Sequence, residues 1–341
     1  MNKSLFIFVF AVLAVLNLNA STDKTIHFSV PTMSVSSITM DVEYGNVVFY
    51  ETSEDSLVVD VRIVMDNIAE NKASKELKNY DVIHHVKDSI LNLHQTRGRV
   101  TNTVRKYRFN YRIGIPKFYP IKIHSLFSSF DIPVWREKID IDATYSHFRF
   151  SGCVGKLGTG KLKLKSSDII ADTLVVGNVN IDHGSISAKE FNKMSISAHY
   201  AKVNIDNCAN ATMTGESSQW KIKRIENVKF NTKYTLIKLG IAVGNVSVTN
   251  SFASVYIDEI SSNSTTLNVK LDKGDLYVGT NFDILNYVYV TLEHASLGDD
   301  MKELDLPHRK DQSKEIYERR RSNGFSSKMY VNLRYGTMYN Q

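Results

Sequence analysis

The sequence predicts an all-β protein whose main body is a single-stranded β-solenoid, preceded by a β-rich capping subdomain with one helix. Three observations predict this fold class. Apolar and polar residues alternate in short strand-like segments along most of the chain, and these segments recur at a nearly fixed spacing. Residues 50–116 follow a different pattern, which sets the predicted cap apart from the repeats.

The composition is that of a folded protein with a sizeable core, in one domain or two. The 341 residues include 42 Lys plus Arg, 36 Asp plus Glu, 43% hydrophobic residues and two Cys. These values exclude a disulfide scaffold, an acidic disordered chain and a collagen-like fibre. The net charge of +6 permits an anionic partner, but it does not by itself indicate nucleic acid.

Residues 1–20 have the features of a secretory signal peptide. Lys3 supplies the positive start, an apolar run extends from Leu5 to Leu16, and Ala20 precedes a polar stretch. The run is shorter than the ~20 residues of a membrane span, and we expect no transmembrane segment in the mature chain. The sequence therefore predicts an exported protein.

Tyr200 lies at the centre of a repeated pattern. Met194 and Ile196 stand six and four positions before it, and Val203 and Ile205 stand three and five positions after it. This pattern predicts two short strands that meet at a corner, with the four apolar residues facing inward. Eight copies have an apolar residue at all four positions, and their central residues are Tyr44, Phe127, Tyr145, Tyr200, Ser217, Tyr234, Phe252 and Lys273.

The spacing of the copies predicts a β-solenoid. From residue 183 to residue 294 the central positions are 17 to 21 residues apart, which is shorter than helical repeats of about 33 residues or propeller blades of about 40. In a β-solenoid each coil pairs with the one before it, and each buried apolar side chain contributes roughly 1.5 to 3 kcal/mol. Two copies fit poorly, the one that starts at Leu162 and Leu164 and the one around His183, which has Gly177 at an apolar position, so we expect bulges or loops there.

The two ends of the chain depart from the repeat. Leu57 to Ile63 and Tyr107 to Ile115 alternate as strands, and between them Asp66 is placed to N-cap a helix that carries Ala69, Ala73 and Leu77 on one face. We expect this subdomain to cover the open end of the solenoid, since an open end is an exposed sheet edge. The predicted domains are a signal peptide (1–20), a β-rich cap (21–116, with a first coil near 38–49), a solenoid (117–298), a mobile charged loop (299–324) and closing strands (325–341).

Several of these segments resemble a known family. They are VEYGNVVFY followed by LVVDVRIVM, the entry YRIGIPKFYPIKI, and coils such as HYAKVNI and KYTLIKL. With the exported start, they are similar to the adhesin-like β-solenoid family of Gram-negative envelope proteins, which includes auto-transporter adhesins and proteins of unknown function. The resemblance covers nearly all of the mature chain. It implies a right-handed β-helix in the periplasm or at the cell surface, without an established catalytic motif.

Two patterns of catalytic or ligand-binding type have ordinary structural explanations. GKLGTGK at 155–161 is one residue short of a phosphate-binding loop and is followed by a strand pattern, so we expect a turn. The ten His show no metal-ligand spacing, and we expect surface or corner positions for His84, His85, His183 and His294. We therefore predict no catalytic residue, no cofactor and no metal.

Two surfaces are candidates for binding. Aromatic residues at the corner position would form a column, whose role is either packing or a platform for sugar rings. Seven basic residues near the cap form either a solvated face or a surface site for anionic envelope glycans or lipid headgroups. They are Arg97, Arg99, Arg105, Lys106, Arg108, Arg112 and Lys117.

The two cysteines are predicted to remain free, buried or half-buried. Cys153 and Cys208 each lie eight residues after a corner, Tyr145 and Tyr200, in coils that are 55 residues apart. Three coils of ~4.8 Å separate them by roughly 14 Å. A disulfide requires Cα atoms within about 7 Å.

These observations predict a non-enzymatic envelope protein that uses a rigid β-solenoid as a scaffold or adhesin-like binding surface. Its partner would be an envelope glycan or another envelope protein. The alternative is a polysaccharide lyase or hydrolase, because long parallel β-helices also support such enzymes. That alternative requires paired acidic residues on adjacent coils, whereas the position after the second strand is acidic only at Asp206 and Asp258.

Overall fold

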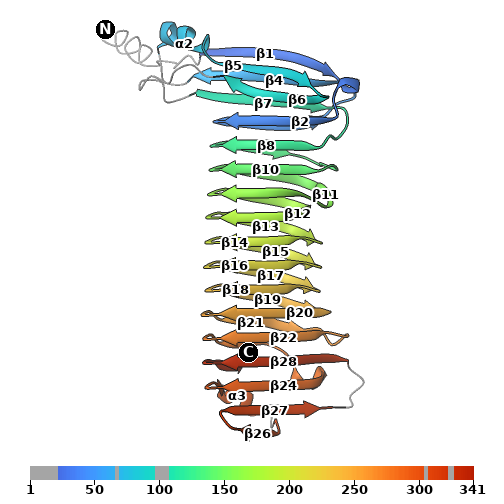
Figure 1. Ribbon diagram of the computed structural model, residues 1–341, viewed down its shortest axis with the longest axis vertical. Coiled ribbons are helices and arrows are strands. Elements are labelled where there is room, and N and C mark those ends of the chain that lie inside the picture. The colour runs from blue at the N-terminus through green and yellow to red at the C-terminus, as the bar shows by residue number, and fades with distance from the viewer. Residues whose placement is uncertain (1–21, 66–68, 97–106, 303–305, 322–325) are drawn as a thin grey trace, which may run out of the picture.

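The computed structural model describes residues 22–65, 69–96, 107–302, 306–321 and 326–341. The protein is all-β, with one sheet of 29 strands that stack along a single long axis (Figure 1). The predicted signal peptide lies outside the described residues. Within them, no helix is long and apolar enough to cross a membrane.

Most of the column consists of one unit, here called a rung, which contains a first strand, a corner residue and a second strand. Successive rungs pair in parallel and in register, so that Ile196 lies beside Met213 and Val203 beside Trp220. This pairing satisfies the backbone donors and acceptors of every inner rung. The regular strands are β13 (Ser185–Asn192), β14 (Ser195–His199), β15 (Lys202–Ala209), β16 (Thr212–Glu216), β17 (Gln219–Glu226), β18 (Lys229–Lys233), β19 (Leu236–Val243), β20 (Asn245–Ser251) and β21 (Val255–Ile260).

The interior of the column is apolar, as the repeat predicts. In all eight copies the four predicted inward residues are buried, including Trp220, Phe230 and Ile237. The polar residues between them face outward, because successive side chains of a strand point to opposite faces. The hydrophobic core therefore extends along the axis of the column rather than forming one compact centre.

The stretch predicted to be irregular has β-bulges. β11 (His147–Lys165) and β12 (Asp168–Asp182) pair in parallel, but their register shifts between Phe150 and Cys153 and again between Val154 and Thr159. β11 is longer than its partner by these extra residues. The predicted bulges are confirmed.

At the N-terminal end, the order of the rungs differs from the order of the sequence. The rung of β2 and β3 lies between that of β6 and β7 and that of β8 and β9. β4 then pairs antiparallel with β7, β1 with β4, and β5 with β6. The elements are β1 (Thr22–Pro31), a 3-10 turn (Thr32–Ser34), β2 (Ser37–Glu43), β3 (Gly45–Glu51), β4 (Ser56–Met65), β5 (Asp81–Lys87), β6 (Ile90–Thr96), β7 (Tyr107–Ile115), β8 (Ile121–Leu126), β9 (Ser129–Ile132) and β10 (Ile139–Thr144).

The predicted helix of this end is present as α2 (Glu70–Leu77), and it buries Ala73 and Leu77. Its N-cap residue is Ala69, which makes no side-chain cap hydrogen bond. The predicted cap, Asp66, lies outside the described residues. The cap prediction was wrong because the helix begins later than the acidic residue suggested.

The C-terminal end corrects two predictions. β28 and β29 do not close the column but pair between β22–β23 and β24–β25, as Figure 1 shows for β22, β28 and β24. The stretch predicted as a mobile loop contains a short helix and a hairpin, of which β27 pairs antiparallel with β24. The elements are β22 (Thr266–Asp272), β23 (Leu276–Val278), a 3-10 turn (Phe282–Ile284), β24 (Leu285–Glu293), β25 (Ser296–Leu297), α3 (Asp299–Lys302), β26 (His308–Asp311), β27 (Lys314–Arg320), β28 (Ser327–Arg334) and β29 (Thr337–Asn340).

These corrections have one physical reason. An end rung has an unpaired edge that needs a partner, and an antiparallel strand supplies the hydrogen bonds without adding another rung. The charged hairpin can cover that edge because many of its side chains, such as those of Lys310 and Asp311, are exposed to water. High charge density indicated a loop, but it is equally compatible with an edge strand.

Candidate binding surfaces

The corner residue of each rung has a left-handed backbone. Tyr200, Tyr234 and Phe252 have φ angles of 50°, 51° and 61°. This conformation is costly for residues with a Cβ atom, so it persists where the surrounding fold requires it. The predicted corners are confirmed, because the same conformation occurs at Tyr44, Phe127, Tyr145, His183, Ser217, Lys273, His294 and Tyr335. Ser166 is a further corner, which the poor fit of its copy had hidden.

The aromatic corner residues stack on one another. The ring centroids of Tyr44 and Phe127 are 5.1 Å apart, and those of Phe127 and Tyr145 are 4.9 Å apart. Each stacked pair contributes about 0.5 to 1.5 kcal/mol. Facing ring surfaces cover each other, so a ring inside the column offers no free face to a ligand. The other stacked pairs are His183 with Tyr200, Tyr234 with Phe252, and His294 with Tyr335.

The predicted basic site is only partly placed by the structure. Arg108 and Arg112 project from the exposed face of β7, and Lys117 follows the end of that strand. The Arg112 guanidinium lies 5.5 Å from the ring centroid of Tyr50, and Asp60 is its cross-strand partner on β4. An acidic neighbour reduces the positive field of this face. The remaining four residues, Arg97, Arg99, Arg105 and Lys106, lie outside the described residues.

A groove of about 640 Å³ opens on the outer face of β2, β6, β8 and β10. His94, Asp41, His124 and Asp142 follow one another across these strands and form one wall. His94 Nδ1 lies 3.2 Å from Asp41 Oδ2, and Lys163 Nζ lies 3.6 Å from Asp142 Oδ2. Both carboxylates of this wall therefore have a basic neighbour.

Two further grooves open on the outer face of the first strands. One of about 280 Å³ crosses β10, β11, β12 and β14, and one of about 270 Å³ crosses β20, β22, β24 and β28. Asp182 and His199 line the first, and Lys270, Tyr289 and Tyr330 line the second. One side of the column is therefore hollowed at several heights and lined by polar side chains.

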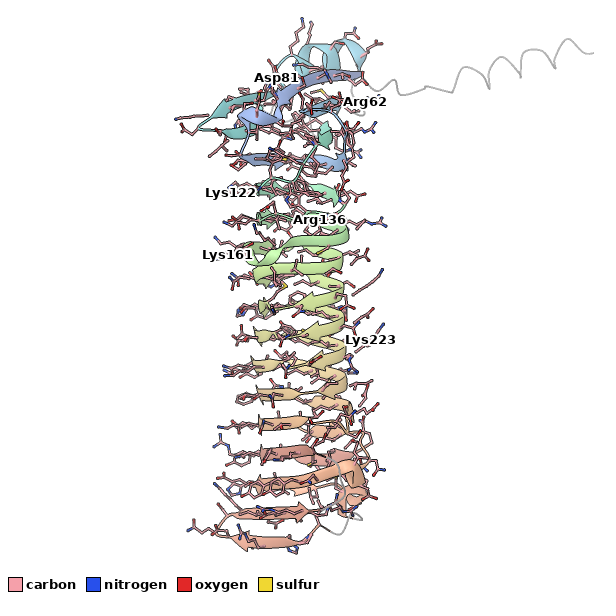
Figure 2. All side chains as sticks on the ribbon, turned by 90° about the vertical axis from the view of Figure 1, so that its right-hand side faces the viewer. Arg62, Asp81, Lys122, Arg136, Lys161 and Lys223 are labelled. Atoms are coloured by element: carbon pink, nitrogen blue, oxygen red, sulfur yellow. The ribbon has the colours of Figure 1, made fainter. Side chains whose placement is uncertain are left out.

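Acidic and basic residues alternate from rung to rung partway along the second strands and form a ladder, in the order Asp172, Lys189, Asp206 and Lys223. A polysaccharide lyase or hydrolase would need paired acidic residues at this position. Lys189 Nζ lies 2.7 Å from Asp172 Oδ1, and Lys223 Nζ lies 2.7 Å from Asp206 Oδ1. The hydrogen bond that Lys189 donates to Asp172, together with the negative charge of that carboxylate, raises the pKa of Lys189. Figure 2 shows Lys223 on the edge of the column opposite to Lys122 and Lys161. Each acid of this ladder thus pairs with a lysine rather than with a second acid.

Both cysteines are free, and only Cys208 is buried. Burial raises its pKa to about 12, so it is a neutral thiol at physiological pH. Cys153 is exposed, which corrects the predicted burial. Because of the bulge in β11, Cys153 pairs with Thr173, which pairs with Glu190, which in turn pairs with Asn207. Cys153 is therefore aligned with the residue before Cys208 rather than with Cys208 itself. The predicted separation of three rungs is confirmed, but the bulge turns Cys153 to the opposite face.

The glycine motif at 155–161 lies within β11. Gly155, Gly158 and Gly160 have φ angles of 100°, 72° and 87°, at the second register shift. Lys161 continues as a strand paired with β12, so no helix N-terminus is available for a phosphate. The predicted turn was wrong: these residues form a bulged part of strand β11, because the left-handed glycines absorb the extra residues without ending the strand.

The histidines are placed by packing. The ring of His84 stacks on Phe28 with centroids 3.8 Å apart, and His183 and His294 belong to the corner column. Over the described part of the chain, no group of three or more His, Cys, Asp or Glu residues is arranged to hold a metal ion.

Two features were not predicted. Each regular rung has a second left-handed corner, as at Asn210, Asn227 and Gly244, and the recurrence of Asn or Gly every 17 residues was the available signal. Tyr256 and Tyr277 also stack at 4.4 Å, and Tyr277 stacks on Tyr339 at 4.8 Å. The second of these contacts depends on the place of β29 beside β23, which sequence spacing does not reveal.

Comparisons with known proteins give the following similarities. The chain is similar to the "putative adhesin" of Parabacteroides distasonis with 16% identity and a TM-score of 0.44, over 76% of this chain and 97% of that one. It is similar to the "putative adhesin" of Parabacteroides merdae with 10% identity and a TM-score of 0.34, over 93% and 96%. It is also similar to a "putative lipid binding protein" of Parabacteroides distasonis with 8% identity and a TM-score of 0.34, over 94% and 97%. No family model matches the sequence, and no curated protein does.

Proposed function

We propose that this protein is an exported β-solenoid of the cell envelope that binds an elongated, hydroxyl-rich polymer along the outer face of its first strands. Parallel pairing of rungs 17 or 18 residues apart, with all four inward positions buried, supports the solenoid. The pattern of residues 1–20 supports export. The family resemblance supports a right-handed path and a periplasmic or surface location.

The grooves on the outer face of the first strands carry the functional proposal. Their walls repeat polar side chains at the ~4.8 Å spacing of the rungs, which suits a partner that also repeats along its length. An envelope polysaccharide has this form and offers a hydroxyl group to each polar position. Arg108 and Arg112, on the exposed face of β7, and Lys117, beyond its end, would offer a separate contact to anionic groups.

Binding without turnover is supported by the ion pairs of the polar ladders. A glycosidase or lyase needs a carboxyl group that is free to act as acid, base or nucleophile. Asp142 lies near Lys163, and Asp206 near Lys223. Both carboxylates are therefore engaged by lysines of the neighbouring rung.

Substitution of Thr144, which lines the 640 Å³ groove, tests the proposal. Thr144→Trp would fill part of the groove, whereas Thr144→Val keeps the volume. We expect Thr144→Trp to weaken binding to immobilised envelope polysaccharide at least tenfold and Thr144→Val to change it less than twofold. Equal binding by both variants would contradict a site in this groove.

An assay for new reducing ends or unsaturated sugars, with the same polysaccharide, separates binding from catalysis. We expect no release above the rate without protein. Release that Thr144→Trp abolishes would overturn the non-enzymatic proposal in favour of the polysaccharide-processing alternative.

A further inference from the structure

The corner residues of successive rungs form a row, here called the corner column, in which most members are aromatic. Three members are not aromatic: Ser166, Ser217 and Lys273. Ser217 lies one rung from Tyr200 and one rung from Tyr234, since Tyr200 N donates to Glu216 O and Ser217 N donates to Lys233 O. Ser166 lies in the same way between Tyr145 and His183. At each serine, an aromatic ring is missing from an otherwise stacked series.

The rings on either side of each serine have one covered face and one face toward the gap. Tyr200 stacks on His183 at 4.8 Å, and Tyr234 stacks on Phe252 at 4.9 Å, so both remaining faces look toward the rung of Ser217. Tyr145 is likewise covered only on the side of Phe127. The exposure of these rings differs: Tyr200 is 60% exposed and Tyr145 54%, whereas Tyr234 is 45% exposed, close to the 44% of Phe127 inside the column. The Lys233 ammonium lies 4.8 Å from the Tyr234 ring centroid.

The gap is as wide as one ring. Rings on adjacent rungs are 4.8 to 5.1 Å apart, so rings two rungs apart face each other across about 10 Å. A ring placed midway lies about 5 Å from both, within the range of stacking contacts. The serine side chain between them is short and half-buried, and it forms the floor of the slot.

The third interruption shows how such a gap is filled. Lys273 Nζ lies 4.9 Å from the ring centroid of Phe252, so the chain occupies this position with its own cation. Lys233 does not fill the gap at Ser217 in this way. Its Nζ is 4.8 Å from Tyr234 and 5.7 Å from Phe252, which places it beside the edges of that stacked pair.

We propose that Ser166 and Ser217 are the floors of two slots, each of which binds one pyranose ring of a glycan between two aromatic rings. The C–H groups of a sugar face carry partial positive charge and meet the negative faces of both aromatic rings. The hydroxyl groups at the sugar edge reach polar residues beside the floor. At Ser217 these are Glu216 and Gln219, and at Ser166 they are Lys165 and Asp168.

The polar residues beside each serine favour a sugar as the ligand. An aromatic side chain of a partner protein would bury these polar groups without offering them hydrogen bonds. The two slots are three rungs apart, or about 14 Å. A single glycan chain or branch that reaches both would gain affinity from bivalent binding. This inference deepens the proposed function, on which it rests, by naming the units of the polymer that the protein would hold.

The double variant Ser166→Tyr/Ser217→Tyr tests the slots, because it completes the aromatic column without removing a ring. The corners accept tyrosine, since Ser217 has a φ of 52° and Tyr234 one of 51°. Ser166→Ala/Ser217→Ala is the matched control, with open slots. The probes are maltohexaose, cellohexaose and chitohexaose, with tyramine as the planar aromatic probe, each titrated calorimetrically against the mature chain.

We expect at least one hexasaccharide to bind, the tyrosine variant to lose affinity tenfold or more, and the alanine variant to stay within twofold. Unchanged binding in the tyrosine variant, or binding of tyramine and of no hexasaccharide, would overturn the inference. Envelope polysaccharide binding by the tyrosine variant at the level of the native chain would refute the slots and leave the proposed groove intact.

Discussion

The regular middle of the column and its two ends differ in how the chain visits the rungs. From β14 to β21, each rung pairs with the next one in the sequence. At the N-terminal end β2 and β3 lie between two rungs that follow them in the sequence. At the C-terminal end β28 and β29 lie between two rungs that precede them. The repeat therefore encodes the shape of a rung, but not its neighbours.

Both ends solve the same problem in the same way. Each end places antiparallel strands on its outermost rung, β4 on β7 and β27 on β24. An antiparallel strand ends the series because its own outer edge does not continue the parallel pattern. At each end the chain forms both the antiparallel edge strands and one more rung. That rung, β2–β3 or β28–β29, therefore lies next to rungs that are not its neighbours in the sequence.

Deletion of residues 326–341 is expected to have the largest effect, since it removes an inner rung rather than a tail. Met329, Val331, Leu333 and Met338 are buried, and each contributes roughly 1.5 to 3 kcal/mol. Their sum is comparable with a typical total stability of about 5 to 15 kcal/mol. We expect loss of the cooperative thermal transition in circular dichroism. An unchanged transition would show that β24 can pair directly with β22.

In the middle of the column, Ile237→Asp is expected to cost several kcal/mol. Ile237 is fully buried between the inward residues of neighbouring rungs, and an unpaired carboxylate there has no partner. Lys238→Asp is the matched control, because residue 238 faces water. Equal melting temperatures of the two variants would refute the rung register.

The difference between middle and ends also marks what the sequence could predict. The corner at Tyr200 and the inward positions were predictable because each is set by local alternation and by contacts that repeat every rung. The place of Leu333 was not, because its rung pairs with residues 62 positions earlier, such as Leu271. Cys153 was assigned to the wrong face because one bulge reverses every later side chain of a strand.

The candidate site was predicted in part. Aromatic corners were visible in the sequence as Tyr and Phe at one register position. The slots at Ser166 and Ser217 needed the stacking geometry, since a serine in a repeat reads as an ordinary polar residue. The grooves on the first strands were not predicted, because each is lined by side chains of several rungs and depends on which strands lie side by side.

Two substitutions at the corner residue Tyr234 test whether the left-handed backbone of the regular rungs is strained. Tyr234→Val and Tyr234→Asn both remove the stacking contact with Phe252, but valine is β-branched and asparagine tolerates a φ of 51°. We expect valine to be less stable than asparagine by about 1 to 2 kcal/mol in urea unfolding. Equal stability would mean that the corner is not strained.

The smallest effect is expected at the ion pair between β22 and β28, which belongs to the rung inserted between β22–β23 and β24–β25. Arg334 Nε and Nη2 donate to the Asp272 carboxylate at 2.8 and 2.9 Å, and these hydrogen bonds lower the pKa of Asp272. A carboxyl group with a lowered pKa in the folded state stabilises the protein above its unfolded pKa of about 3.9, and this contribution is lost as the pH falls through the folded value.

Asp272→Asn should therefore lower the melting temperature slightly at pH 7, by no more than about 2 °C, because the pair is exposed to solvent. The difference between the variant and the native chain should shrink below about pH 4, since protonation then removes the charge of the native carboxylate as well. Asp258→Asn, at an exposed position of β21, is the control and should show no such convergence. If the Asp272→Asn difference grew as the pH fell, the ion pair would not be what connects the inserted rung to its neighbour.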